Sequence, residues 1–215
     1  MKGQLPLRLK LAGHTRLEDY VGDVSKALVE LDGFVLLYGP AGSGKTHLLQ
    51  GMTRGSDASF YLGDLEQLDP AIIEGLENAQ LVCMDDIDSV LGNAAWETAL
   101  FHLINACRDS RTKLLFSTST PPAELKADLP DLASRLQGGY HLMTDTLDDA
   151  AKLEVIRRKA QRRGFDMNED VCRFILSRAE RDMHHLAKLV EQLDEETLRR
   201  QKKVTIPFVK QALGL

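Results

Sequence analysis

The sequence predicts an α/β fold: a five-stranded parallel sheet covered by helices, followed by a small all-helical domain. Short apolar runs alternate with longer segments of helical period between residues 34 and 143, and only helical patterns follow residue 148. Continuous apolar strands separated by helices indicate a parallel sheet that is buried on both faces. A length of 215 residues suits one such domain with a small appendage.

The five expected strands are apolar runs bounded by turn residues, at 34–39, 59–63, 81–85, 113–118 and 140–143. Helical periodicity predicts helices between them at 45–54, 65–78 and 94–110. The single tryptophan, Trp96, lies in the third of these helices, where we expect it to pack or to cap the helix.

Further helices are expected at 148–163, 169–180, 183–202 and 205–213. Gly164 suits the end of the first of them, Asn168 the cap of the second, and Pro207 the first turn of the last. We therefore expect a tail at 1–14, an α/β domain at 15–146 and a helical domain at 147–215, with a hinge near 144–148.

The composition is that of an ordinary globular protein, with 43% hydrophobic and 27% charged residues. No apolar run approaches the ~20 residues of a membrane span, and the N-terminus lacks the apolar core of a signal peptide. The widely spaced Cys83, Cys107 and Cys172 suit neither a disulfide framework nor a zinc site. We expect a cytoplasmic protein without a membrane partner.

The net charge of −5 disfavours a free-standing nucleic-acid binder, although the charge is uneven. Residues 1–147 carry 12 Lys and Arg against 20 Asp and Glu, a sum of −8, whereas residues 148–215 carry 15 against 12, a sum of +3. The basic C-terminal third could contact phosphate or an acidic partner, or it could be an ordinary charged helical surface.

A phosphate-binding loop is the strongest motif. Its pattern G-x-x-x-x-G-K-[ST] lies between an apolar strand and a helical segment, which disfavours a chance match. Glycines let backbone N–H groups line a concavity at the positive end of the helix dipole. We expect Lys45 to reach the β- and γ-phosphates and Thr46 to bind Mg²⁺. The expected cofactor-binding residues here are Gly39, Pro40, Ala41, Gly42, Ser43, Gly44, Lys45, Thr46 and His47.

Two carboxylates follow the apolar strand 81–84. Asp85 is placed to hold the Mg²⁺ shell through water, and Asp86 to polarise an attacking water. The pair could instead cap the strand end, and Asp86 could be structural, with slow hydrolysis or none. The strand 113–118 also ends in hydroxyls, of which Ser119 could hydrogen-bond a γ-phosphate or simply form a turn.

In this order and spacing the motifs resemble the AAA+ class of ATPases, and within it the nucleotide-binding region of the bacterial replication initiator DnaA. The segments that carry the resemblance are 17–23, 38–50, 81–88, 115–122 and 129–136, and it covers nearly all of residues 15–215. The resemblance implies an AAA+ core followed by a helical lid domain, with ADP or ATP and Mg²⁺ as cofactors. We expect neither the initiator's N-terminal domain nor its helix-turn-helix domain, a combination similar to regulatory proteins that inactivate the initiator.

The tail resembles the short peptide by which bacterial proteins dock on the sliding clamp of DNA polymerase III. The matching residues are Gln4, Leu5, Pro6, Leu7 and Leu9. Proline keeps such a segment extended, and the leucines suit an apolar pocket. The clamp, and through it DNA, would then be partners. The alternative is a tail that packs on its own domain or stays disordered.

Arg135 matches the arginine finger of the AAA+ class, which reaches the nucleotide of a neighbouring subunit. The resemblance implies that it acts on ATP held by the initiator, although a salt bridge is the alternative. We expect Asp131 or Asp128 to cap the short helix that precedes it. The face that holds such an arginine usually mediates association, so a homo-oligomer is possible.

The resemblance also points to the base-binding wall and to the lid. Leu17, Tyr20 and Val21 would contact the base, with simple core packing as the alternative for Tyr20. In the lid, His184 stands where the family has an arginine, and Arg181 could replace that arginine; both could also be surface residues.

The expected function is therefore a regulator that binds ADP or ATP with Mg²⁺, docks on the clamp and promotes hydrolysis of initiator-bound ATP. Its own hydrolysis is expected to be weak or absent. The main alternative is a self-sufficient AAA+ ATPase such as a helicase loader. A small-molecule kinase and a direct DNA reader are weaker readings, because no acceptor pocket and no helix-turn-helix are evident.

Overall fold

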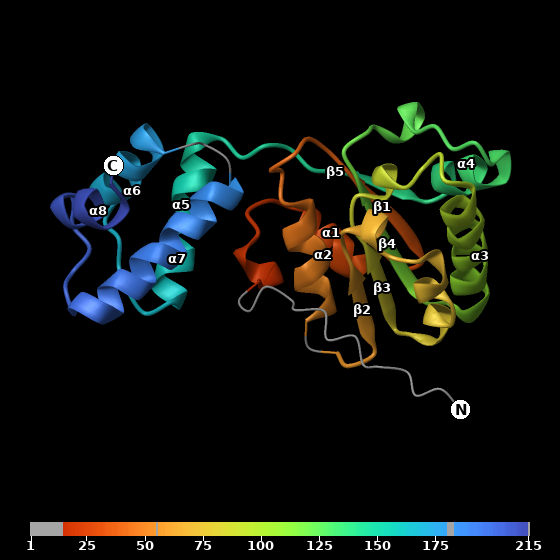
Figure 1. The fold of residues 1–215 in the computed structure, drawn as a ribbon, viewed down its shortest axis with the longest axis horizontal. Helices are drawn as coiled ribbons and strands as arrows, with labels where there is room; N and C mark the ends of the chain where they lie inside the picture. Colours follow the sequence, from red (N-terminus) through yellow and green to blue (C-terminus); the bar gives the residue numbers. More distant parts are fainter. Residues whose placement is uncertain (1–14, 55, 180–182, 215) are drawn as a thin grey trace. The chain divides into compact units, whose positions relative to one another are not determined.

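The computed structural model describes residues 15–54, 56–179 and 183–214, shown as a coloured ribbon in Figure 1. The chain divides into two compact units. Among the described residues, the first comprises 15–18, Gly22–Pro40 and Lys45–Thr144. The second comprises Asp19–Val21, Ala41–Gly44 and Asp145–Leu215. The second unit thus contains the helical region together with two short pieces from the N-terminal half.

The first unit is built on a parallel sheet with the strand order β2-β3-β4-β1-β5. The strands are β1 (Phe34–Tyr38), β2 (Ser59–Leu62), β3 (Leu81–Met84), β4 (Lys113–Thr118) and β5 (Tyr140–Met143). Because all four strand pairs are parallel, the carboxyl ends of the strands share one edge of the sheet. Ligands of open α/β sheets bind at this edge.

Helices pack on both faces of this sheet. They are α1 (Val24–Glu30), α2 (Lys45–Thr53), α3 (Ala94–Ser110) and α4 (Pro130–Gln137). Figure 1 shows α3 and α4 on one side of the strands, with α1 and α2 on the other. Successive side chains of each strand point to opposite faces of the sheet. Leu36 and Phe116 belong to the apolar cluster under α3, whereas their chain neighbours Leu37 and Leu115 are buried outside that cluster. Trp96 is buried in the same cluster, so it packs α3 against the sheet.

The continuous helix expected over 65–78 does not form. The segment consists of the short 3₁₀ helices η2 (Leu65–Gln67), η3 (Pro70–Ile73) and η4 (Leu76–Asn78). Leu68 is extended, and Gly75 has a φ of +83°, so the backbone leaves the helical region between the pieces. Leu65 and Ile73 are nevertheless buried in the cluster under α3. The apolar residues of this segment are spaced like those of a helix because one side of an irregular segment packs on the core.

The second unit is mainly a helical domain. Its helices are α5 (Asp149–Arg162), α6 (Glu169–Arg178), α7 (Met183–Arg200) and α8 (Ile206–Leu213). The side chains of Asp148, Asn168 and Thr205 accept backbone N–H bonds at the starts of α5, α6 and α8. Apolar residues from all four helices form one core, which includes Ile156, Ile175, Val190 and Val209.

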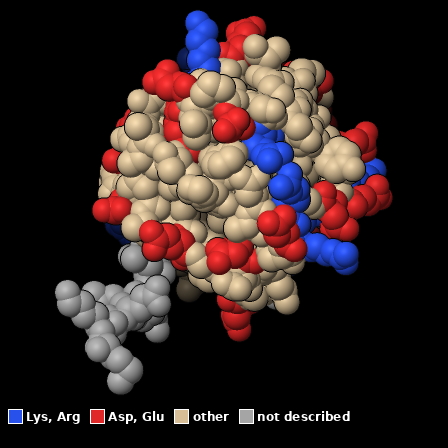
Figure 2. Space-filling model, turned by 90° about the vertical axis from the view of Figure 1, so that its right-hand side faces the viewer, with Lys and Arg blue, Asp and Glu red and all other residues tan. Residues whose placement is uncertain are grey.

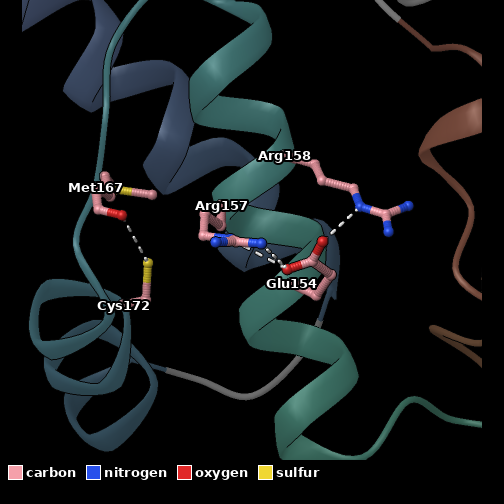
Figure 3. A network of polar contacts seen from close by, with 5 residues as sticks. All are labelled: Glu154, Arg157, Arg158, Met167 and Cys172. Atoms are coloured by element: carbon pink, nitrogen blue, oxygen red, sulfur yellow. Dashed lines mark hydrogen bonds and ion pairs between the residues drawn. The ribbon is translucent and has the colours of Figure 1, made fainter.

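Several basic side chains of this domain are paired with acids of the same domain. Figure 3 shows Glu154 between Arg157 and Arg158 on α5, with a nitrogen–oxygen distance of 2.7 Å to each arginine. The ion pairs of Glu154 with Arg157 and Arg158 favour an ordinary charged helical surface over a phosphate-binding one.

In the same view, the Cys172 thiol donates to the Met167 carbonyl over 4.0 Å. Burial raises the pKa of this thiol to about 11, which keeps it protonated. Within the described ranges, no helix is both long and apolar enough to cross a membrane.

Candidate nucleotide-binding site

The loop from Gly39 to Gly44 connects β1 to α2 at the carboxyl edge of the sheet. Gly42 and Gly44 have φ values of +77° and +90°, which disfavour residues with a Cβ atom. A Cβ at Gly44 would also stand 2.9 Å from the ring of Tyr20. The loop leads directly into the first turn of α2, whose unpaired backbone N–H groups attract anions. This arrangement suits a phosphate chain.

Lys45 begins α2, and its amine is fixed inside the site. The residue is 6% exposed. Its Nζ atom donates to the carbonyls of Gly39 at 2.8 Å and Pro40 at 3.2 Å, and to the Ser119 hydroxyl at 3.5 Å. The structure therefore brings the tip of β4 to the lysine of the loop. A hydroxyl and an ammonium group here can both contact the same phosphate.

Asp85 follows β3, and its carboxylate is held from both sides. The residue is 5% exposed. The Tyr61 hydroxyl on β2 donates to Oδ2 at 2.8 Å, and the Ser117 hydroxyl on β4 donates to Oδ1. Burial, followed by the charge of Asp85, raises the pKa of the Tyr61 phenol, so it remains a donor. Two strands thus orient the carboxylate that the sequence assigns to the Mg²⁺ shell.

Asp86 adopts a left-handed conformation with a φ of 49°, which is uncommon for a residue with a side chain. Its backbone N–H donates to the Ser117 hydroxyl at 2.8 Å, and this bond holds the turn. The side chain is exposed. The pKa of Asp86 is raised, first by partial withdrawal from water and then by the charge of Asp85. A carboxylate with a raised pKa is a better proton acceptor, as general-base chemistry requires.

Asp88, in the short helix η5 (Ile87–Ser89), holds the tip of β4. Its Oδ2 atom accepts from the Ser119 backbone N–H at 3.1 Å and from the Thr120 hydroxyl at 3.4 Å. The Thr118 hydroxyl in turn accepts from the Thr120 N–H at 3.0 Å. The residues at the end of β4 therefore form a hydrogen-bonded turn, and Ser119 among them also contacts Lys45. The sequence presented these two roles as alternatives.

The donor atoms at this edge fit a Mg²⁺ ion that also binds phosphate. Thr46 contributes an exposed side chain in the first turn of α2, and Asp85 an oriented carboxylate. Mg²⁺ prefers such oxygen ligands and keeps several waters. In the part of the chain that the structure describes, no group of three or more His, Cys, Asp or Glu could hold a metal ion by itself. An ion here would therefore need phosphate oxygens and water as further ligands.

The expected base-binding residues lie at different places. Tyr20 packs against Gly44 of the loop, and Val21 is half-buried beside it in the chain. Leu17, in η1 (Leu17–Asp19), lies further along α2, where a Cβ at Gly51 would stand 2.8 Å from its backbone nitrogen. Leu17 also lines a hollow of about 500 Å³. Of the three residues expected at the base, the structure therefore places Tyr20 against the loop, whereas Leu17 lies beside Gly51.

His47 lies in the first turn of α2, and its side chain binds the segment before α1. Its Nε2 atom donates to the Arg16 carbonyl at 2.8 Å. This contact fixes the N-terminal segment on α2, so His47 supports the site through the chain that leads to Tyr20.

Arg135 lies in the last turn of α4, in the first unit. It is half-buried, and its guanidinium makes no ion pair or hydrogen bond with any residue that the structure describes. The neighbouring Leu132 and Leu136 are fully buried and fix the helix on the core. An arginine on a fixed helix that pairs with none of the described residues is available to a second molecule.

The prediction that Asp131 or Asp128 caps α4 is wrong. The N-cap residue is Leu129, and neither Asp128 nor Asp131 forms a side-chain cap bond there. The acceptor comes instead from Glu97 on α3, which binds the backbone N–H groups of Asp128 and Leu129. A cap from a residue 31 positions away leaves no local pattern. The only sequence signal for Glu97 is its place in the first turn of a helix.

Several expected residues fall outside the described part of the chain. They are the clamp-peptide residues Gln4, Leu5, Pro6, Leu7 and Leu9, and the lid residue Arg181. His184 lies in the first turn of α7, and its side chain is also outside the description.

The surface near α3 and α4 is not a basic nucleic-acid face. Figure 2, which views the molecule from that side, shows a largely uncharged surface with scattered Asp and Glu and one narrow band of Lys and Arg. Nucleic-acid binders concentrate positive charge over such a face.

Two sequence comparisons place the chain among known proteins. The model of the family described as "Hda, lid domain" matches residues 149–213, which contain α5 to α8. An uncharacterized protein of Haemophilus influenzae is 36% identical over 231 residues, and the match covers 100% of both chains.

Solved structures share the whole fold. Domain III of the Thermotoga maritima replication initiation protein DnaA matches with a TM-score of 0.75 at 21% identity, over 93% of this chain and 95% of that one. AMPPCP-bound DnaA from Aquifex aeolicus matches with a TM-score of 0.68 at 19% identity, over 89% of this chain and 70% of that one. These matches confirm the expected AAA+ core with a helical lid domain. The chain therefore has a C-terminal domain that matches the Hda lid family at residues 149–213, within a fold that it shares with domain III of DnaA.

Proposed function

We propose that this protein binds ADP or ATP with Mg²⁺, docks on the DNA polymerase III sliding clamp, and stimulates hydrolysis of ATP held by the initiator DnaA. The ADP-bound initiator that results would be inactive, so a second round of initiation is prevented. The observation that carries the proposal is Arg135, whose guanidinium has no partner among the described residues although α4 is firmly packed. The match of residues 149–213 to the Hda lid domain, and the fold shared with DnaA, support the initiator as the partner.

The nucleotide part of the proposal rests on the loop from Gly39 to Gly44, on Lys45 and on the oriented carboxylate of Asp85. DnaA from Aquifex aeolicus has the same fold and is known with bound AMPPCP, an ATP analogue. The bound nucleotide would supply phosphate oxygens to Mg²⁺. Around it, this chain's own residues bind and orient: backbone N–H groups and Lys45 hold the phosphates, and Thr46 and Asp85 hold the hydrated ion.

Action on a partner's nucleotide is favoured over strong hydrolysis by the protein itself. The residue after Asp85 is Asp86, whose side chain is one methylene shorter than that of a glutamate, so it reaches a water less far. In the lid, His184 stands where the family's arginine is expected, so a permanent positive charge is missing at that position. A guanidinium delivered across a subunit boundary supplies the transition-state charge to the other molecule instead.

Tyr61→Phe provides a test of the Mg²⁺ site. The substitution removes the hydroxyl that donates to Asp85 and keeps the ring. A hydrogen bond to a charged group contributes about 1.5–3 kcal/mol, so we expect about tenfold more Mg²⁺ to be needed for half-maximal ADP binding. Binding of ADP without Mg²⁺ should stay unchanged. A Mg²⁺ titration with a fluorescent ADP analogue measures both. The control is Tyr140→Phe on β5, and an equal loss with and without Mg²⁺ would contradict the assignment.

The function itself is tested by measuring hydrolysis of initiator-bound ATP with this protein, DNA-loaded clamp and ADP, omitting each in turn. We expect full stimulation only when all three are present. The double variant Gln4→Ala, Leu5→Ala should behave as if the clamp had been omitted, because a peptide docked by a few side chains depends on each of them. Lys2→Ala, outside the peptide, is the matched control. Stimulation that persists without the clamp would remove the docking step.

The self-sufficient ATPase remains the second candidate, since it would share the loop and both carboxylates. Rapid hydrolysis by the isolated protein, increased by single-stranded DNA, would favour that candidate. The same assay without initiator therefore separates the two functions.

A further inference from the structure

We propose that Glu97 is a positioning residue that holds α4 in the orientation from which Arg135 reaches the partner's nucleotide. The inference rests on the proposed function and adds to it a residue that touches neither nucleotide. Glu97 lies in the first turn of α3, and Arg135 lies in the last turn of α4. The Glu97 side chain joins the loop before α3 to the residues that precede α4.

Three backbone N–H groups surround the carboxylate of Glu97 and donate hydrogen bonds to it. The residue is 1% exposed. Its Oε1 atom accepts from the Gly92 N–H at 2.8 Å and from the Asp128 N–H at 3.0 Å, and its Oε2 atom accepts from the Leu129 N–H at 2.7 Å. Gly92 belongs to the loop that follows Asp85 and Asp86. Asp128 and Leu129 are the last two residues before α4. One side chain therefore ties the acidic loop to the start of the helix that carries Arg135.

Electrostatics explain why a charged group is stable in this buried position. Glu97 is in the first turn of α3 and binds the residues that lead into α4, so it faces the positive ends of two helix dipoles. Burial by itself raises the pKa of its carboxyl, but the three backbone donors outweigh burial and the pKa is lowered overall. Glu97 is therefore ionised at neutral pH, and its three bonds are charge-assisted.

The other end of α4 is held separately. The Gln137 amide donates to the Pro122 carbonyl, and His141 Nε2 on β5 donates to the Leu136 carbonyl at 3.0 Å. Arg135 lies next to this second attachment. Leu132 and Leu136 hold one face of α4 on the core, and the polar attachments at its two ends set the direction of its axis there. With the Glu97 attachment lost, the start of the helix can shift while its other end stays in place. A displacement of about 1 Å at a reacting group can cost about 10²-fold in rate.

The test compares Glu97→Gln with the matched control Glu124→Gln, an exposed acid in η6 (Pro122–Glu124) before the same helix. Glutamine keeps one acceptor oxygen and turns an N–H₂ group toward a backbone donor, so at least one of the three bonds is lost. At saturating protein we expect the maximal rate of initiator ATP hydrolysis to fall tenfold or more. The half-saturating concentration and the protein's own ADP affinity should stay within about twofold. Amide hydrogen exchange at Gly92, Asp128 and Leu129 should become faster, while exchange in β1 is unchanged.

A pH series gives a second readout. Because the folded pKa of Glu97 lies below its ordinary value of about 4.3, its contribution to the free energy of unfolding is present above that pH and is lost as the pH falls through the folded pKa. Glu97→Gln does not titrate, so the difference in unfolding free energy between wild type and variant should shrink as the pH falls.

Gln137→Ala keeps the proposal testable if Glu97→Gln does not fold. Gln137 is exposed, and its replacement removes one of the two bonds at that end of α4, while the Pro122 carbonyl keeps its bond from the Leu125 N–H. We expect the maximal rate to fall with ADP affinity retained. Wild-type stimulation by Glu97→Gln, or parallel loss of ADP affinity and stimulation, would overturn the positioning role. If the wild-type protein itself fails to stimulate hydrolysis, the proposed function falls, whereas an active wild type with an equally active Glu97→Gln overturns this inference alone.

Discussion

Replacing Arg135 with alanine is expected to lower the stimulated rate of initiator ATP hydrolysis by about 10³-fold, because an arginine finger contributes ~10³–10⁵ to such rates. The guanidinium spreads its charge over a plane that matches the oxygens of the transferring phosphoryl group. Arg135→Lys keeps a positive charge but loses this geometry, so it should restore only a small part of the rate. The measurement is single-turnover hydrolysis of ATP preloaded on the initiator.

The matched control for this experiment is Lys126→Ala, which removes an exposed positive charge from the segment before α4. Its rate should remain close to that of the wild type. The ADP affinity of Arg135→Ala itself should also be unchanged, because the arginine acts on the partner's nucleotide. Undiminished stimulation by Arg135→Ala would remove the central element of the proposed function.

Lys45→Ala is expected to weaken ADP and ATP binding by about 100-fold. The substitution removes charge-assisted hydrogen bonds to phosphate, at about 1.5–3 kcal/mol for each, and each 1.4 kcal/mol corresponds to a factor of ten. It also removes the bonds that Nζ makes to the Gly39 and Pro40 carbonyls, so the loop loses part of its support. Isothermal titration calorimetry with Mg²⁺ present measures the change directly.

Lys26→Ala serves as the control, since this lysine is exposed and forms a surface pair with Asp23. Its nucleotide affinity should equal that of the wild type. Retained affinity in Lys45→Ala would mean that the loop does not hold the phosphates. Together the two sets of variants separate the protein's own nucleotide, which depends on Lys45, from the partner's nucleotide, which depends on Arg135.

Local patterns predicted most of the fold. The strands β4 and β5 and the helix α3 have the bounds expected from apolar periodicity, and Asn168 caps α6 as expected. The failure at 65–78 has a physical cause: packing against one cluster produces helical spacing even where Pro70 and Gly75 interrupt the helix. Periodicity reports which side of a segment is buried, and it does not distinguish one helix from a chain of short turns.

The candidate site was predicted less completely. The sequence indicated Lys45, Asp85 and Ser119 because motifs fix their spacing, but it gave no signal for the groups that orient them. Tyr61 reaches Asp85 from a strand 24 positions away, and Asp88 holds Ser119 from 31 positions away. Such partners become visible only when parallel strands align their carboxyl ends.

The sequence alone thus determined the phosphate-binding loop motif, the pair of adjacent carboxylates, and most of the alternation of strands and helices, since each depends on residues close together in the chain. Arg135 became a candidate only through the resemblance to the AAA+ class. The tertiary structure decided that Arg135 has no partner among the described residues, that Glu97 and not a neighbouring aspartate binds the start of α4, and that Asp85 is held between two hydroxyls. The physical reason is that burial and long-range hydrogen bonds exist only after distant segments have packed together, and no local pattern encodes which polar group will meet which.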